Sequence, residues 1–168
     1  MNMDKRKNNS ATKEESGSKR TKYNVKKDTS DRTFNGIVFD SAVEMRYYRD
    51  VVLPLLDDGS LVHCERQKRY ILQPSFAHND KKILPIEYKA DFYTIDKTGK
   101  ETVIDIKGHP DAVALLKRKM FWYTYPDVDY VWVGYSRIDG GFVAYETILA
   151  GRKERKKLKQ KSKESKEQ

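Results

Sequence analysis

The stretch KADFYTIDKTGKETVIDIKG, residues 89–108, predicts two strands joined by a tight turn. Apolar and β-branched side chains are frequent in residues 86–95 and 101–107, and a short polar segment with one glycine separates the two runs. A three-residue loop with its glycine in the left-handed conformation pairs Asp96 with Lys100. Every further pair then lies one residue farther out on both strands.

This pairing brings three charged side chains together. Counting outward from the turn puts Asp91 directly opposite Asp105, and opposite residues share one face of a sheet with Cβ atoms about 5 Å apart. Lys107 lies two residues beyond Asp105 and projects on the same face. Two carboxylates this close repel each other unless a cation lies between them. The pattern therefore predicts a site for a hard divalent cation beside a lysine, which suits phosphodiester hydrolysis.

The same spacing also fits a surface hairpin. Asp91, Asp105 and Lys107 would then form a solvated ion-pair cluster. Such exposed pairs are common, and each stabilises a fold by less than about 1 kcal/mol. A third acid near the first two would favour the metal site over this alternative.

The candidate third acid is Glu44, in a helix expected to begin at Ser41. Ser41 followed three residues later by Glu44 is a capping-box pattern, and apolar residues recur at helical spacing as far as Leu56. Pro54 is expected to kink or shorten this helix. Glu44 shares the apolar stripe that should face the sheet, where an acid needs a partner or a metal. A capping role alone fits its position equally well.

The remaining elements indicate an α/β fold around one mixed sheet. An Asn-Gly step within residues 33–39 predicts a short hairpin, and residues 74–85 are expected to form a loop. The other predicted elements are strand 61–73, strands 86–95 and 101–107, helix 110–123, strand 129–135 and strand 142–145. Together with the first helix they give the core order α-β-β-β-α-β-β, a mixed sheet flanked by helices.

Charge divides the chain into three parts. The 168 residues carry a formal net charge of +9. Residues 1–32 hold 10 Lys or Arg and 5 Asp or Glu, residues 33–150 hold 15 and 17, and residues 151–168 hold 9 and 3. We expect one domain over 33–150, between a disordered basic N-terminal tail and a basic C-terminal tail. Such tails favour a polyanion such as DNA as a partner, although they also suit a role in keeping the protein dissolved.

Other function classes find no support in the sequence. Cys64 is the single cysteine, so neither an intrachain disulfide nor a thiolate metal cluster is expected. His63, His78 and His109 are scattered and form no metal-binding set. No stretch approaches the roughly 20 apolar residues of a membrane helix, and no signal peptide is recognisable. The expectation is a soluble intracellular protein without membrane association or organic cofactor.

Several segments together resemble a known family. They are GIVFDSAVE (residues 36–44), LQP (72–74), YKADF (88–92) and VIDIKG (103–108). Over residues 20–148 the chain resembles small phage and prophage proteins assigned to the PD-(D/E)xK, or restriction-endonuclease-like, nuclease superfamily. Its layout is also similar to Holliday-junction resolvases and to the endonuclease subunit of heteromeric bacterial transposases. Ala90 stands where the proline of the superfamily's name is found.

The resemblance implies a restriction-endonuclease-like fold and a Mg²⁺-dependent DNA endonuclease, in which Mn²⁺ can substitute. It implies that Glu44, Asp91 and Asp105 bind one or two metal ions. Ile106 would add a carbonyl ligand, and Lys107 would be the catalytic lysine. The implied role is phage-encoded, in DNA recombination, repair or replication, in the cytoplasm of a bacterial host.

Contacts to DNA are expected from Gln73, Lys117 and Lys119, although a strand end and a solvated helix face explain these residues as well. A junction resolvase would be a homodimer, because it cuts two strands symmetrically. Two other functions stay open. One is a catalytically silent DNA-binding module of the same fold, and the other is a phage protein that binds another protein.

Overall fold

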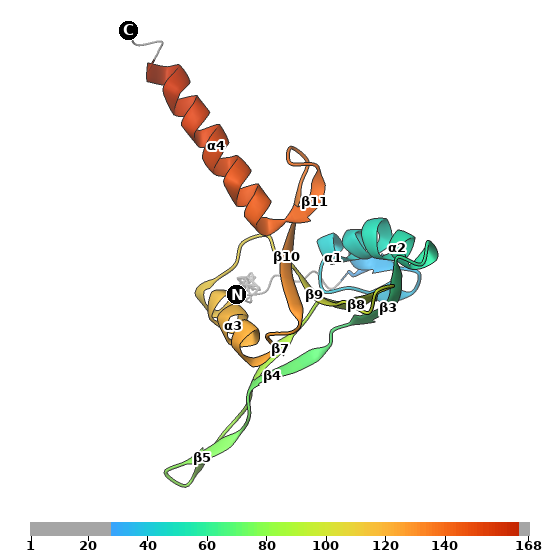
Figure 1. Cartoon of the computed structure of the whole chain (residues 1–168), viewed down its shortest axis with the longest axis vertical. Coiled ribbons are helices and arrows are strands. Elements are labelled where there is room, and N and C mark those ends of the chain that lie inside the picture. The colour runs from blue at the N-terminus through green and yellow to red at the C-terminus, as the bar shows by residue number, and fades with distance from the viewer. Residues whose placement is uncertain (1–27, 165–168) are drawn as a thin grey trace, which may run out of the picture.

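The computed structural model describes residues 28–164 of the chain. Its centre is a five-stranded mixed sheet with helices packed on both faces (Figure 1). The expected mixed α/β class is confirmed. Most of the predicted N-terminal tail, residues 1–27, lies outside the described residues, as do residues 165–168 of the predicted C-terminal tail.

The central sheet has the strand order β11-β10-β9-β8-β3. Its strands are β3 (Leu61–Arg66), β8 (Phe92–Asp96), β9 (Glu101–Ile106), β10 (Asp129–Ser136) and β11 (Gly141–Ala144). Strands β9 and β10 are parallel, and all other neighbours are antiparallel. Helix α3 (Ala112–Thr124) supplies the crossover that a parallel pair requires.

The pairing of β8 with β9 has the predicted register. Phe92 pairs with Ile104 and Ile95 with Glu101, as counting outward from the turn requires. Gly99 in that turn has a φ of 86°, the left-handed conformation that favours glycine. Continued one residue beyond Phe92 and Ile104, where the chain is no longer part of β8, the same count places Asp91 opposite Asp105.

The first helix begins where the sequence predicts. The hydroxyl oxygen of Ser41 accepts a backbone amide of the first turn of α1 (Ala42–Tyr47) at 3.1 Å. One π-helical turn, η2 (Tyr48–Val52), connects α1 to α2 (Leu53–Asp57). Pro54 explains this turn, because proline has no amide hydrogen and clashes with the carbonyl four residues earlier. The proline therefore changes the helical pairing without ending the helix.

Two predicted strands are each divided at the same place. The strand predicted over residues 61–73 forms β3 and then β4 (Arg69–Gln73), and the one predicted over 86–95 forms β7 (Ile86–Lys89) and then β8. Gln67, at the division, has a φ of 60° and donates its amide to a carbonyl of the facing strand at 3.3 Å. The register is the same on both sides of this break, where Arg66 pairs with Phe92 and Arg69 with Lys89, so the left-handed residue interrupts the ladder without inserting a residue. Strands β4 and β7 consequently leave the central sheet and pair with each other.

The prediction of a loop over residues 74–85 is wrong. Strands β5 (Phe76–His78) and β6 (Lys81–Ile83) form an antiparallel ribbon, which continues β4 and β7 into a projecting arm (Figure 1). Asn79 and Asp80 join them with φ of 48° and 58°, the left-handed pair of a two-residue hairpin turn. Every residue of both strands is exposed, so no apolar alternation marks them in the sequence.

The apolar core consists of two clusters, one on each face of the sheet. Phe121 of α3 packs in the first cluster and Tyr47 of α1 in the second. Successive residues of β9 alternate between them, with Val103 in the first cluster and Ile104 in the second. Asp105 therefore faces the side of the sheet that α3 covers.

The ends of the described chain add smaller elements and one long helix. The 3₁₀ turn η1 (Ser30–Arg32) precedes the predicted hairpin, whose strands β1 (Thr33–Phe34) and β2 (Ile37–Val38) are joined by an Asn-Gly turn. Helix α4 (Tyr145–Glu164) runs through the domain boundary predicted after residue 150. In Figure 1 its first turns lie against β10 and the remainder projects from the sheet. None of the helices in residues 28–164 combines the length and the apolar composition that crossing a membrane requires.

Gly134 in β10 allows α4 to approach the sheet closely. A Cβ atom at this position would lie 2.6 Å from Cδ1 of Ile148 and 3.2 Å from the carbonyl oxygen of Lys107. The side chain of Ile148 comes from α4, and Lys107 belongs to the predicted site. Close packing at Gly134 thus brings the start of α4 next to that site.

We predict that Gly134→Ala destabilises the protein by about 1–3 kcal/mol, because the added methyl group overpacks the contact between α4 and β10. Urea unfolding followed by circular dichroism measures the change. Gly108→Ala is the matched control, since a Cβ at Gly108 meets no atom within 4 Å. Equal stabilities of the two variants would contradict this account of the packing.

Candidate active site

Asp105 is part of β9, and Asp91 lies just outside β8, at the same end of the β8–β9 pair. Asp105 is 3% exposed. Asp91 directly precedes β8, and its Oδ2 accepts the amide of Ile106 at 2.7 Å. Burial raises the pKa of the Asp91 carboxyl to about 8, and the charges of Asp105 and Glu44 act in the same direction. Asp91 therefore holds a proton more tightly than an isolated carboxyl group would.

A chain of donors fixes the Asp105 carboxylate. Its Oδ2 lies 2.8 Å from Nζ of Lys107 and accepts the hydroxyl of Tyr130 at 3.1 Å. Nε1 of Trp132 in turn donates to the Tyr130 oxygen at 2.8 Å. Tyr130 and Trp132 are buried, whereas the side chain of Lys107 is 24% exposed. Residues of the core thus hold Asp105 on one side, and the partly exposed Lys107 contacts it on the side of the surface.

Glu44 approaches this pair from the other side of the sheet. Helix α1, which carries it, packs on the face opposite to α3. Glu44 is 8% exposed, and its Oε1 accepts the hydroxyl of Ser41 at 2.8 Å. Burial raises its pKa, and the charges of Asp40 and Asp105 add to the effect. Glu44 therefore serves in the helix cap while remaining close enough to Asp105 to interact electrostatically.

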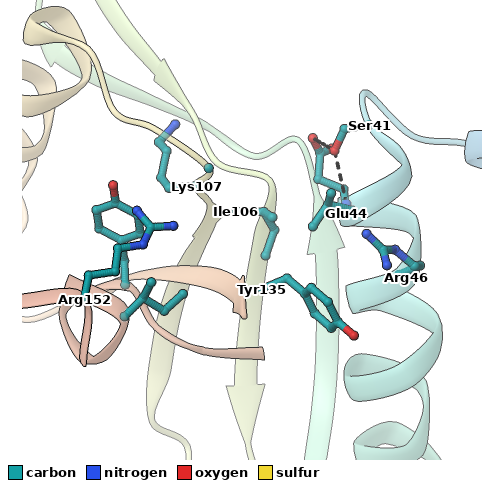
Figure 2. Close-up of a pocket in the computed structure, with 11 residues that line it drawn as sticks. Ser41, Glu44, Arg46, Ile106, Lys107, Tyr135 and Arg152 are labelled. Carbon is teal, nitrogen blue, oxygen red and sulfur yellow. Dashed lines mark hydrogen bonds between the residues drawn. The ribbon is translucent and has the colours of Figure 1, made fainter. Parts of the chain in front are cut away.

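Glu44 and Lys107 border a cleft of about 450 Å³. In Figure 2, Ser41 and Glu44 lie on one side of the cleft and Lys107 on the other, with Ile106 between them. The full lining consists of Ser41, Val43, Glu44, Arg46, Ile106, Lys107, Gly108, Tyr135, Tyr145, Ile148 and Arg152. Two arginines, one from α1 and one from α4, add positive charge to that of the lysine. These cations suit the binding of a phosphate-bearing ligand.

A second cleft, of about 290 Å³, shares Lys107 with the first. Asp105 and Tyr130 border it, and so does Lys117 of α3. Nζ of Lys117 donates to the carbonyl of Glu87 at 2.7 Å. Of the lysines predicted to contact DNA, Lys117 is therefore beside the candidate site.

Gln73 and Lys119 lie apart from the acids. Both border a hollow next to α3, together with Leu72, Met120, Tyr123 and Thr124. None of the acids of the candidate site borders that hollow. A contact between Gln73 or Lys119 and nucleic acid would thus be made away from the two clefts.

Tyr130, Arg46 and Arg152 border the two clefts but were not predicted from the sequence. Tyr130 reaches Asp105 because β10 runs parallel to β9, and no short turn allows that register to be counted. Arg152 was assigned to the C-terminal tail by its basic surroundings. Arg46 stands two residues after Glu44, and only the way α1 packs brings it to the cleft.

The three acids suit a divalent cation in their chemistry but do not converge in this conformation. Carboxylate oxygens are the ligands that Mg²⁺ prefers, and burial raises the pKa of both the partly buried Asp91 and the buried Glu44. In residues 28–164, however, no group of three or more His, Cys, Asp or Glu side chains is arranged to hold a metal ion. Each acid is instead turned to a neighbour: Glu44 to Ser41, Asp91 to the Ile106 amide, and Asp105 to Lys107. The donors fit the cation, and binding it requires these contacts to be exchanged.

A comparison with known protein families assigns most of the chain to one family. Residues 20–138 match the family described as "Protein of unknown function (DUF1064)". The chain belongs to this family. The matched segment contains Glu44, Asp91, Asp105 and Lys107, and it ends before α4. Comparisons with curated proteins and with solved structures gave no match.

We predict that Tyr130→Phe lowers the free energy of unfolding by about 1–3 kcal/mol, because it removes a donor from Asp105 and leaves the Trp132 indole without its acceptor. Urea unfolding measures the loss. Tyr88→Phe is the control: the Tyr88 hydroxyl is buried beside Tyr130 but makes no hydrogen bond of ordinary geometry. If the two variants are equally stable, the hydrogen bonds from Trp132 through Tyr130 to Asp105 do not contribute to the stability of the fold.

A second prediction concerns pH. Because burial raises the pKa of Asp91 above its ordinary 3.8 to about 8, the folded state binds a proton that the unfolded state releases. Asp91 is therefore least destabilising below pH 4, and stability declines as the pH rises from about 4 to about 8. Asp91→Asn should reduce this decline by about 1 kcal/mol or more, since one pKa unit corresponds to about 1.4 kcal/mol. Unfolding at several pH values in the presence of a chelator measures it, and equal slopes in the two proteins refute it.

Proposed function

We propose that this protein is a divalent-metal-dependent DNA endonuclease. The observation that carries the proposal is the pair of the partly buried Asp91 and the buried Asp105, with Nζ of Lys107 2.8 Å from Asp105. A solvated ion-pair cluster, the alternative from sequence, does not account for a carboxylate that is 3% exposed. Placing two acids next to each other away from water is unfavourable. A cation bound between them would neutralise their charges and remove this cost.

Hydrolysis of a phosphodiester forms a bond from a water oxygen to phosphorus and breaks one P–O ester bond, whose oxygen takes up a proton. Asp91, Asp105 and Glu44 would hold Mg²⁺, or Mn²⁺ in its place, with the Ile106 carbonyl as a further ligand. When bound, that ion would polarise the phosphoryl oxygen and lower the pKa of a water molecule.

The chain's own groups account for the remaining requirements. The Lys107 ammonium, partly exposed beside Asp105, is placed to orient the attacking water and to stabilise negative charge on the phosphoryl oxygens. Arg46 and Arg152 border the same cleft and would bind phosphate oxygens. Ser41 orients Glu44 through the hydrogen bond to Oε1. The buried Trp132 and Tyr130 keep the Asp105 carboxylate in place.

The architecture supports the same proposal. A helix with an acid precedes the antiparallel strands that carry Asp91 and Asp105, and a crossover helix then leads to a parallel strand. The resemblance to restriction-endonuclease-like nucleases implies a helix acid, a hairpin aspartate and a D-x-K triplet in a similar sequence order. A role in recombination, repair or replication of phage DNA, including junction resolution by a homodimer, is part of the proposal by that resemblance alone.

A DNA-binding module without cleavage is the second candidate. One observation favours it: within the described residues the acids do not form a three-ligand metal group. The two candidates differ in one measurable property. A nuclease cuts DNA when a divalent metal is added, whereas a silent module binds it unchanged.

We predict that the full chain cuts labelled duplex, flap or four-way-junction DNA in Mg²⁺ or Mn²⁺, and that Asp105→Asn and Lys107→Ala each lower the rate about 100-fold or more. Gel analysis of cleavage products over time measures the rates. Asp129→Asn is the matched control, because Asp129 forms an exposed ion pair with Lys100 at the same 2.8 Å, away from the clefts.

Three outcomes discriminate. Cutting that survives both Asp105→Asn and Lys107→Ala excludes the proposed site. Binding without cutting in either metal supports the silent module. Loss of activity in Asp129→Asn to the same extent would mean that the effect arises from general damage to the sheet.

A further inference from the structure

Helix α4 carries a stripe of cations that begins at the candidate site. Arg152, Lys156, Lys159 and Lys163 follow one another at intervals of three or four residues, so they lie on one face of the helix. Arg152 borders the cleft that contains Glu44 and Lys107 (Figure 2). The same arginine borders a second hollow of about 580 Å³ on α4, whose lining includes Lys156 and Lys159. Cleft and stripe are therefore continuous.

An ion pair fixes the direction of this helix. The guanidinium of Arg155 donates to both carboxylate oxygens of Asp139, at 2.6 and 3.0 Å. Asp139 lies in the turn between β10 and β11, and its Oδ2 also accepts the hydroxyl of Ser136. A bidentate pair of this kind has a defined geometry. The stripe consequently leaves the cleft in one direction, not as a freely swinging tail.

We propose that this stripe is a track for the phosphate backbone of a nucleic-acid duplex that extends from the cleft past Arg152. The inference rests on the proposed function for the polyanion's identity. From Arg152 to Lys163 the helix rises about 17 Å, at 1.5 Å per residue. That length corresponds to about five base pairs at 3.4 Å each. The protein would thus contact duplex on one side of the cut more extensively than on the other.

Charge favours a nucleic acid over a protein partner. Residues 152–164 contain eight Lys or Arg and two Asp or Glu. Like charges three or four residues apart destabilise a helix, and a polyanion laid along it relieves that repulsion. The apolar side chains at the hollow, Ile138 and Leu158, are 78% and 61% exposed but stand among cations. Two such residues fall short of the apolar centre that protein interfaces have.

The test is binding of a duplex of about 30 base pairs, longer than the track, by the full-length protein in a chelator at several salt concentrations. One variant carries Lys156→Gln and Lys159→Gln, on the stripe. The matched control carries Lys153→Gln and Lys157→Gln, on the other side of the same helix, with an equal change in net charge. We expect the slope of log Kd against log salt to become shallower by about 2 in the first variant and to stay near wild type in the second.

The outcomes separate this inference from the proposed function. Equal slopes in the two variants, or no salt-dependent binding of duplex by the wild type, overturn the track. If the stripe variant has the same slope as the wild type, the proposed track is also overturned, and an acidic protein becomes the alternative partner for this face. Because the measurement uses a chelator, it does not depend on cutting. If the slopes are as expected but the protein never cuts DNA in Mg²⁺, the proposed phosphate track is supported and the proposed nuclease activity is refuted.

Discussion

Repulsion between a partly buried carboxylate, Asp91, and a buried one, Asp105, is the interaction that the groups around them have to offset. The β8–β9 register sets Asp91 and Asp105 opposite each other, and each negative charge opposes the other. Neighbouring groups compensate in part: the Ile106 amide donates to Asp91, and Lys107 and Tyr130 approach Asp105. These compensating groups come from β9, β10 and the residue that follows β9. Parallel pairing of β10, and therefore the α3 crossover, is part of what makes the pair tolerable.

The division of the strands at Gln67 leaves the Asp91–Asp105 pair at the end of the central sheet. Strand β3 pairs with β8 only as far as Arg66 and Phe92, and beyond that point the chain turns out of the central sheet. Asp91 lies at this turn, where its carbonyl accepts the Gln67 amide at 3.3 Å. Had β3 and β8 continued as one regular ladder, Asp91 would be in the middle of a sheet.

Local signals predicted much of this arrangement. The glycine turn fixed the β8–β9 register by counting, and Ser41 marked the start of α1 because a capping hydroxyl leaves a distinct pattern. Long-range features were not predictable in the same way. The partner of Tyr130 depends on a parallel register set by α3, and the side from which Glu44 approaches depends on how α1 packs. The exposed strands β5 and β6 carry no alternation, and basic residues concealed the helical continuation of α4.

The arm formed by β5 and β6 also has a consequence for association between molecules. Among the described strands these two pair only with each other, so each has an unpaired edge, and Phe76 and Ile83 face each other across the ribbon while exposed to solvent. An exposed strand edge with apolar side chains is a template for pairing with another chain. Lys81 and Lys82 on β6 set like charges against each other whenever two such ribbons meet. Because lysines on an exposed edge strand oppose edge-to-edge pairing, Lys81 and Lys82 should limit association of this ribbon with a second copy.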